Sequence, residues 1–139
     1  MGSEIIEKLK ETYNQMGKEN LDLLGRVYSD NVIFQDPFHR IDGLANLKRY
    51  FENMYSKLNS IQFDYLSVIK SDNSAVLTWK MTFSHQSIKK GRAISIAGAT
   101  HLKFDEKIFY HYDYFDSSAM LFEHLPIIGT MLKWIRKQV

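Results

Sequence analysis

The feature that most constrains the fold is the stretch at residues 91–116, which reads GRAISIAGATHLKFDEKIFYHYDYFD. It contains two long β-prone runs separated by a short acidic turn at residues 105–107, a pattern that predicts two antiparallel strands. Because side chains alternate between the two faces of a strand, His111, Asp113 and Phe115 leave the second strand on the same face. A carboxylate among aromatic neighbours on a sheet face is therefore the main candidate for a functional group.

The period of two continues upstream and predicts two further strands, so that four consecutive antiparallel strands are expected. Parity puts His101 on the opposite face from Thr100. One face of the strand at residues 61–69 is expected to carry Ile61, Phe63, Tyr65, Ser67 and Ile69. One face of the strand at residues 75–85 is expected to carry Leu77, Trp79, Met81, Phe83 and His85.

The first half of the chain has the period of helices instead. Apolar residues at helical spacing predict amphipathic helices at residues 4–16, with Tyr13 on the buried stripe, and from Asn20, a plausible cap, to Tyr28. A short β-prone run at residues 32–35 stops at Asp36-Pro37, because proline cannot donate a hydrogen bond to a neighbouring strand. The longest early helix is expected to follow Asp42-Gly43 and to reach Leu58.

The tail, residues 117–139, returns to the helical pattern, with an interruption at Pro126 and a basic end. Its apolar stripe favours a lid or core packing, although a basic amphipathic helix is also compatible with a membrane or protein surface. Helices, then an antiparallel meander, then a closing helix predict an α+β fold. The length of 139 residues is that of one domain spanning residues 1–139.

The composition excludes several classes of function. The net charge of +2 and the absence of a basic face give no nucleic-acid signature, and the cluster at residues 89–92 is interpreted as a solvated turn. Without cysteine there is no disulfide, thiol nucleophile or thiolate metal site. No cationic start with an apolar run, and no window of 18 apolar residues, is present, which predicts a cytoplasmic protein that does not enter membranes.

Several local strings, in this order, resemble a known family. These are YSDNVIFQDPF before the long helix, FDEKI at the last hairpin, and YDYFDSSAM followed by LPIIG. The chain resembles the SnoaL-like branch of the nuclear-transport-factor-2-like superfamily, which includes ketosteroid isomerase, limonene epoxide hydrolase and polyketide cyclases. The resemblance implies a cone-shaped α+β barrel, in which three N-terminal helices pack on a strongly bent antiparallel sheet around an apolar pocket and a C-terminal helix closes it.

The resemblance also implies roles for individual residues. Asp36 matches the general base of ketosteroid isomerase, and Tyr13 falls within one residue of its oxyanion-donating tyrosine, but the second acidic donor would lie near Thr100 and is missing. Asp113 matches the strand aspartate of limonene epoxide hydrolase. That enzyme's remaining catalytic residues fall at Trp79, Met81, Phe34 and Asp36, so its triad cannot operate here.

Each candidate has a structural interpretation beside the functional one. Burial among aromatic rings should raise the pKa of Asp113 and suit it to general acid or base catalysis, unless it is a satisfied polar group paired with His111, His101 or Tyr13. Asp36 before proline is also ordinary turn chemistry. The candidate catalytic residues are Asp113, Asp36, Tyr13 and His111, and the candidate pocket residues are Phe34, Trp79, Met81, Phe83, His85, Thr100 and Phe115.

These observations leave three functional hypotheses. The first is an isomerase, cyclase or hydrolase that acts on a small hydrophobic molecule and needs no cofactor; no metal is expected, since His111 and Asp113 give two ligands at best. The second is a non-catalytic ligand-binding or protein-interaction module, because both known catalytic sets are incomplete. The third is a dimerisation domain, and a homodimer is the expected assembly.

Overall fold

The structure is a computed structural model, and it describes residues 2–86 and 91–116. The helices are α1 (Gly2–Gln15), the 3-10 helix η1 (Leu21–Leu23), α2 (Leu24–Val27) and α3 (Leu44–Lys57). The strands are β1 (Tyr28–Gln35), β2 (Arg40–Asp42), β3 (Leu58–Lys70), β4 (Ser74–His85), β5 (Ile94–Phe104) and β6 (Ile108–Phe115). The helix expected at residues 117–139 lies outside the described residues.

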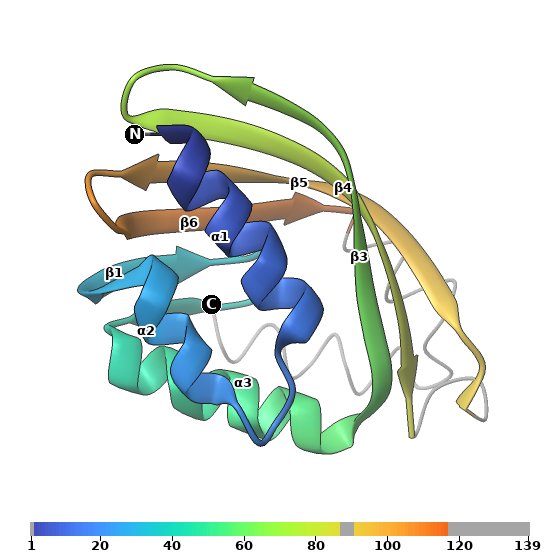
Figure 1. The fold of residues 1–139 in the computed structure, drawn as a ribbon. Coiled ribbons are helices and arrows are strands. Elements are labelled where there is room, and N and C mark those ends of the chain that lie inside the picture. Colours follow the sequence, from blue (N-terminus) through green and yellow to red (C-terminus); the bar gives the residue numbers. More distant parts are fainter. Residues whose placement is uncertain (1, 87–90, 117–139) are drawn as a thin grey trace.

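The six strands form one sheet in the order β2-β1-β6-β5-β4-β3 (Figure 1). The predicted meander of four antiparallel strands, β3 to β6, is confirmed. The expected sheet was wholly antiparallel, but β1 pairs with β6 in parallel, so the sheet is mixed. This long-range pairing brings the strand before the Asp36-Pro37 turn next to the strand that carries His111 and Asp113.

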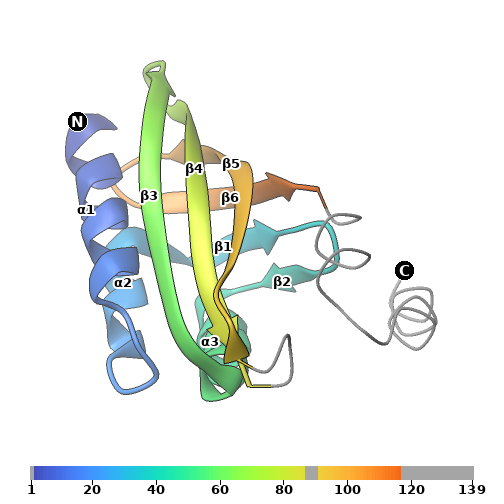
Figure 2. The same ribbon diagram turned by 90° about the vertical axis from the view of Figure 1, so that its right-hand side faces the viewer.

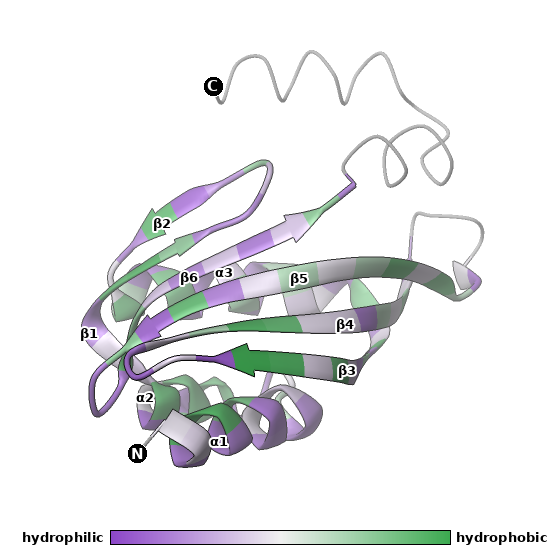
Figure 3. Cartoon of the chain, turned by 90° about the horizontal axis from the view of Figure 1, so that it is seen from above, coloured by the Kyte–Doolittle hydropathy of each residue, from purple (hydrophilic) through white to green (hydrophobic). Residues whose placement is uncertain are grey.

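The sheet is strongly bent and does not close, and this confirms the predicted α+β class. Figure 1 shows α1 and α3 within the curl of the sheet, and Figure 2 shows how far β3 and β4 turn away from the direction of β1 and β6. The main core fills the space between these helices and the concave face. The hydropathy colouring of Figure 3 has hydrophobic and hydrophilic residues intermixed along the helices and strands, as amphipathic elements require.

The helices form where the sequence predicts them because each buries one apolar stripe. In α1, Ile5, Leu9 and Tyr13 are spaced by four residues and are all buried. Gly43 precedes α3 with φ of +91°, a conformation that side chains rarely adopt, and its position explains why the helix begins at Leu44.

The segment around Tyr28 differs from the prediction. The expected helix from Asn20 to Tyr28 is divided into η1 and α2, and Tyr28 begins β1, where it pairs with Ile108 of β6. Asn20 makes no side-chain cap and instead accepts a hydrogen bond from the Gly17 amide at 2.5 Å. Tyr28 fits the helical spacing of the preceding residues, but it lies in a strand because its backbone pairs with a segment about 80 residues away. The local sequence pattern carries no information about that pairing.

The face assignment of β3 was wrong for its second half. Tyr65 pairs with Trp79, but Ser67 pairs with Thr78, so β3 holds one extra residue between them. Such a bulge reverses the parity of every later residue. Ile69 is therefore on the convex face and is 71% exposed. The alternating pattern had predicted it on the opposite face, with Ile61, Phe63 and Tyr65.

Candidate functional site

A chain of hydrogen bonds crosses the interior from α1 to β6. The hydroxyl oxygens of Tyr13 and Tyr28 lie 2.6 Å apart, and the Tyr28 hydroxyl lies 2.7 Å from Nδ1 of His111. Nε2 of His111 lies 2.7 Å from Oδ1 of Asp113. Three elements, α1, β1 and β6, therefore supply one continuous polar path that ends at a carboxylate.

A second branch reaches the same carboxylate from the middle of the sheet. The Thr100 hydroxyl donates to Oδ1 of Asp113 at 2.5 Å, and Nε1 of Trp79 donates to the Thr100 hydroxyl at 2.8 Å. These residues are neighbours because Thr100 pairs with Asp113 in the β5–β6 ladder. Asp113 on β6 is thus the acid beside Thr100 on β5.

The directions of the hydrogen bonds in the chain can be worked out from Asp113, the carboxylate at its end. An ionised Asp113 only accepts hydrogen bonds, so Nε2 of His111 carries a proton and donates it. An imidazole that carries its one proton on Nε2 can accept at Nδ1 from the Tyr28 hydroxyl, and that hydroxyl can accept from Tyr13. In this arrangement each group donates its one proton toward Asp113.

Asp113 is the accessible end of this chain. Its side chain is 21% exposed, whereas that of His111 is 3% exposed. Both hydrogen bonds described above go to Oδ1, and Oδ2 accepts none from the described residues. Oδ2 of Asp113 is therefore the oxygen of this chain that the described residues leave without a hydrogen bond.

The charge of Asp113 acts on four buried or half-buried phenols from four elements. Burial is the main cause that raises the pKa of each hydroxyl, and the Asp113 charge raises it further. The four residues are Tyr13 on α1, Tyr28 on β1, Tyr50 on α3 and Tyr65 on β3. The Asp113 carboxylate on β6 thus acts electrostatically on hydroxyls from four different elements.

Asp36, the second candidate acid, lies in a different environment. Its Oδ1 accepts the backbone amides of Phe38 and His39, each at 2.8 Å, and lies 3.3 Å from Nδ1 of His39. Its Oδ2 accepts the Tyr50 hydroxyl at 3.0 Å. Burial acts to raise the pKa of Asp36, but these hydrogen bonds and the charge of His39 outweigh it and leave the pKa below the usual value.

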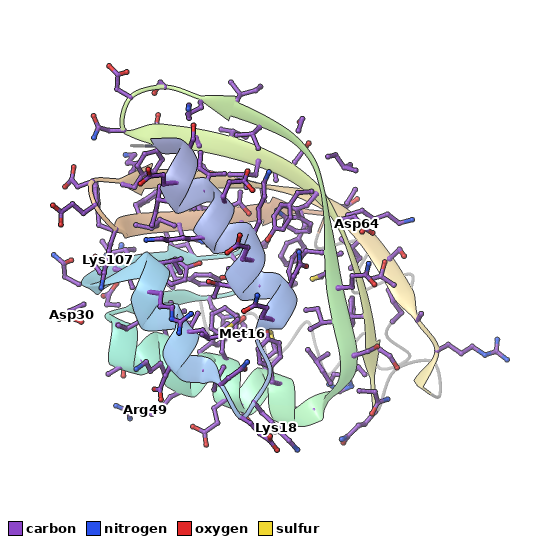
Figure 4. The ribbon with its side chains drawn as sticks, viewed as in Figure 1. Met16, Lys18, Asp30, Arg49, Asp64 and Lys107 are labelled. Atoms are coloured by element: carbon purple, nitrogen blue, oxygen red, sulfur yellow. The ribbon has the colours of Figure 1, made fainter. Side chains whose placement is uncertain are left out.

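Aromatic rings surround the polar chain. Phe34 stacks on the His111 ring with centroids 4.5 Å apart, and Tyr13 contacts Phe63 edge to face at 5.5 Å. Phe63 also meets Trp79 edge to face at 5.5 Å. Figure 4 shows side chains filling the space between α1 and the sheet. Phe34, Trp79 and Thr100, three of the predicted pocket residues, therefore lie at the chain itself.

The other predicted pocket residues share the concave face but lie apart from this chain. Phe83 forms a separate apolar cluster, against which Met81 and Phe115 pack. His85 lies at the end of β4 opposite Leu58, where burial and the charge of Lys57 lower its pKa. His101 lies on the convex face, where its ring contacts Tyr110, as its parity predicts.

Sequence analysis did not predict the environments of three inward-facing tyrosines. Tyr28 was assigned to a helix, and the pairing of Tyr50 with Asp36 has no local signal. Tyr55 is 6% exposed, and its hydroxyl has no hydrogen-bond partner among the described residues. The helical spacing of α3 marks Tyr50 only as an inward residue, and it does not say what its hydroxyl contacts.

The described residues hold no group of three His, Cys, Asp or Glu side chains that could bind a metal ion. None of the helices in the described segments is long and apolar enough to span a membrane. A surface hollow of about 390 Å³ lies between α1 and α2, lined by Lys8, Thr12 and Arg26 among others. No residue of the hydrogen-bonded chain lines this hollow. The candidate functional site is therefore assigned from the hydrogen bonds of Tyr13, Tyr28, His111 and Asp113.

Comparison with solved structures establishes the fold. An NTF2-like protein of unknown function from Burkholderia pseudomallei K96243 is 12% identical with a TM-score of 0.74, over 86% of this chain and 93% of that one. A protein with a ketosteroid isomerase-like fold from Catenulispora acidiphila DSM 44928, in complex with trimethylamine, is 13% identical with a TM-score of 0.74, over 85% and 89%. TerC, co-crystallised with polyporic acid, is 14% identical with a TM-score of 0.72, over 84% and 92%.

Comparison of sequences establishes the family. No curated protein matches the sequence. The model of the SnoaL-like domain matches residues 9–111, which include the second half of α1, the Asp36-Pro37 turn, α3, strands β1 to β5 and the first half of β6. The match thus extends from the helix that carries Tyr13 to His111 at the centre of the polar chain. The chain belongs to the SnoaL-like domain family.

Proposed function

We propose that this protein is an acid–base enzyme that needs no cofactor and uses Asp113 to transfer a proton on a small, largely hydrophobic substrate. The observation that carries the proposal is the hydrogen-bonded chain that ends on a partly exposed carboxylate. An idle carboxylate in such surroundings is costly, and a general base must be reachable by its substrate. Among the groups of the chain, Asp113 meets both conditions.

The geometry supports a proton-transfer reaction of the isomerase kind. Oδ2 of Asp113 takes a proton from a carbon beside a carbonyl group, and the C–H electron pair moves into a new C=C bond while the carbonyl electrons move to oxygen. Return of the proton to a different carbon completes the reaction with no net change in atoms or charge. His111 and Thr100 hold Oδ1 fixed throughout and are positioning residues.

Asp36 receives a different role in this proposal. A carboxylate that accepts from four donors, with a pKa below the usual value, has little tendency to take up a proton. Its hydrogen bonds to the amides of Phe38 and His39 hold the turn that joins β1 to β2. We therefore assign Asp36 to the architecture of the site, and Tyr13 to the buried end of the proton chain.

Two structural neighbours support binding of a small molecule. One was solved with trimethylamine and another with polyporic acid, so this fold holds small ligands of different polarity in those proteins. The SnoaL-like family also includes cyclases and isomerases, and the proton transfer proposed for Asp113 is of that kind. A homodimer remains the expected assembly, and the exposed Leu66, Ile69 and Tyr114 offer apolar surface for it.

The test is a thermal-shift screen against steroid ketones, terpenoid epoxides, aromatic polyketides and fatty acids, followed by turnover assays on each hit. A ligand at 100 times its Kd stabilises the fold by about 2.7 kcal/mol, which is roughly 10 °C for a chain of this size. Asp113→Asn is expected to abolish turnover while the protein stays folded, and Asp64→Asn on an exposed position of β3 is the matched control. Stabilising ligands without turnover in the wild type would favour a binding module.

A further inference from the structure

The hollow between α1 and α2 is an open space that the proposed acid–base site does not use. Its volume is about 390 Å³, and Figure 1 shows the two helices that border it. Leu23 of η1 and Arg26 of α2 line one side. Residues of α1 line the other side, and all of them are polar: Lys8, Glu11, Thr12 and Gln15. Two separate segments thus bring charged and polar side chains together around one space.

Thr12 brings a hydroxyl to this hollow from a buried position of α1. The residue is 5% exposed and lies among the buried residues of the helix, such as Leu9 and Tyr13. Its hydroxyl makes no hydrogen bond with residues 2–86 or 91–116. A hydroxyl at a buried position is expected to have a partner, which can be protein or water. The hollow is the open space from which a partner for Thr12 can come.

Two cations that line the hollow have no acidic partner within the described segments. Lys8 and Arg26 are exposed, and neither forms an ion pair with a carboxylate of residues 2–86 or 91–116. The carboxylates of Glu7 and Asp22, on the same two segments, are each paired with another lysine, at 3.4 Å and 3.3 Å. The charges of Lys8 and Arg26 are therefore available to a ligand in the hollow.

Glu11 is the one acid among the residues that line the hollow. It is exposed and likewise forms no ion pair within the described segments. Its charge offsets one of the two cations, so the lining of the hollow carries one net positive charge. A further cation lies beside α2, where Nζ of Lys107 donates to the carbonyl of Gly25 at 2.7 Å, one residue before Arg26. The balance of charge at this place therefore favours an anion.

We infer that the hollow between α1 and α2 binds the oxyanion group, a carboxylate or a phosphate, of a small molecule. Arg26 presents paired N–H donors that match two oxygens of either group, and Lys8 adds a second positive charge. The Thr12 hydroxyl and the Gln15 amide are the neutral donors. A volume of about 390 Å³ is that of a small-molecule site. The inference does not rest on the proposed function, because no residue of the Asp113 chain lines the hollow.

The test compares three probes that share a three-carbon body and differ in charge. Glycerol 3-phosphate carries a phosphate, glycerate carries a carboxylate, and glycerol carries neither. Each is titrated into the isotope-labelled full chain at pH 7 and constant ionic strength, and its Kd is measured from the shifts of assigned backbone amide resonances. At least one of the two anions is expected to bind about tenfold more tightly than glycerol, with shifts in α1 and α2. The anion that binds more tightly identifies the oxyanion group.

Variants with opposite expected effects locate the binding. Arg26→Gln removes a positive charge from an exposed position and is expected to weaken binding of the anion about tenfold. Glu11→Gln removes the negative charge of the lining and is expected to tighten binding about two- to threefold. Arg92→Gln makes the same change as Arg26→Gln at an exposed residue that does not line the hollow, and is expected to leave the affinity unchanged. Thr12→Val is expected to weaken binding of the anion without lowering the melting temperature, because the hydroxyl has no partner in the described segments.

The inference is overturned if neither anion binds more tightly than glycerol, or if the amide shifts lie outside α1 and α2. It is also overturned if Arg26→Gln and Arg92→Gln lower the affinity equally, because the anion then responds only to the net charge of the protein. Circular dichroism checks that each variant is folded, and the comparison of the three probes on the wild type stands without the variants. None of these results bears on the proposed acid–base function, which is judged by turnover and its loss in Asp113→Asn.

Discussion

The polar chain predicts that the same chemical change, removal of one phenol oxygen, has opposite effects on stability at two tyrosines. In Tyr28→Phe the lost oxygen had two partners, the hydroxyl of Tyr13 and Nδ1 of His111. Both partners stay buried and lose their hydrogen bonds. In Tyr55→Phe the lost oxygen had no hydrogen-bond partner in the part of the chain that the structure describes.

The magnitudes follow from the cost of an unmade hydrogen bond. A buried donor or acceptor left without a partner costs about 1–3 kcal/mol, so Tyr28→Phe is expected to lower the free energy of unfolding by roughly 2–4 kcal/mol. Tyr55→Phe removes such a penalty and keeps the ring that stacks on Phe51, and it is expected to raise the free energy of unfolding by about 1 kcal/mol.

Equilibrium unfolding in urea measures both effects. With a slope of about 2 kcal/mol per molar urea, the unfolding midpoint should fall by roughly 1–2 M in Tyr28→Phe and rise by about 0.5 M in Tyr55→Phe. Equal slopes in all three proteins serve as the control for a common unfolded state. The reasoning is refuted if Tyr28→Phe unfolds at the wild-type midpoint, or if Tyr55→Phe is destabilised as much as Tyr28→Phe.

Three further predictions concern the backbone and Asp36. Gly98→Ala would bring a methyl group within 2.8 Å of Cζ2 of Trp79 and is expected to destabilise the fold by about 1–3 kcal/mol and to shift the tryptophan fluorescence, whereas Gly25→Ala, which has room, is not. Gly43→Ala is expected to cost about 1–3 kcal/mol in thermal unfolding, because a side chain is strained at φ of +91°; a wild-type melting temperature would contradict this. The pKa of Asp36 is lower in the folded protein than its usual 3.8, so its ionisation stabilises the fold above pH 3.8 and this contribution disappears as the pH falls below that value. Asp36→Asn should therefore be less stable than the wild type at pH 7, with a gap that narrows in melts below pH 4; a constant gap would rule this out.

The hairpin and its chemistry could be predicted from sequence because they depend on local patterns. Alternation along β6 put His111 and Asp113 on one face, and the structure places their side chains 2.7 Å apart. Alternation along β4 likewise put Trp79 on the concave face. A period of two or of 3.6 residues is a property of consecutive residues, so the sequence carries it directly.

The partners of these residues were decided by pairings distant in the chain. Tyr28 contacts His111 across 83 positions because β1 adds to the sheet in parallel beside β6. Tyr50 on α3 contacts Asp36 because that helix packs against the end of β1. The spacing of apolar residues does not show which strands become neighbours in the sheet. The sequence alone therefore predicted His111 and Asp113 on one face but not their link to Tyr28.

The sequence by itself determined the α+β class, the family resemblance, the antiparallel meander and the face that carries Asp113. Only the tertiary structure decided that the sheet is mixed and that one extra residue in β3 sends Ile69 to the outside. It also decided that both oxygens of Asp36 accept hydrogen bonds, whereas the described residues donate to Oδ1 alone of Asp113. The physical reason is that element type and side-chain facing follow from nearest neighbours along the chain. Hydrogen-bond saturation and charge balance depend on every group that folding brings within a few ångströms.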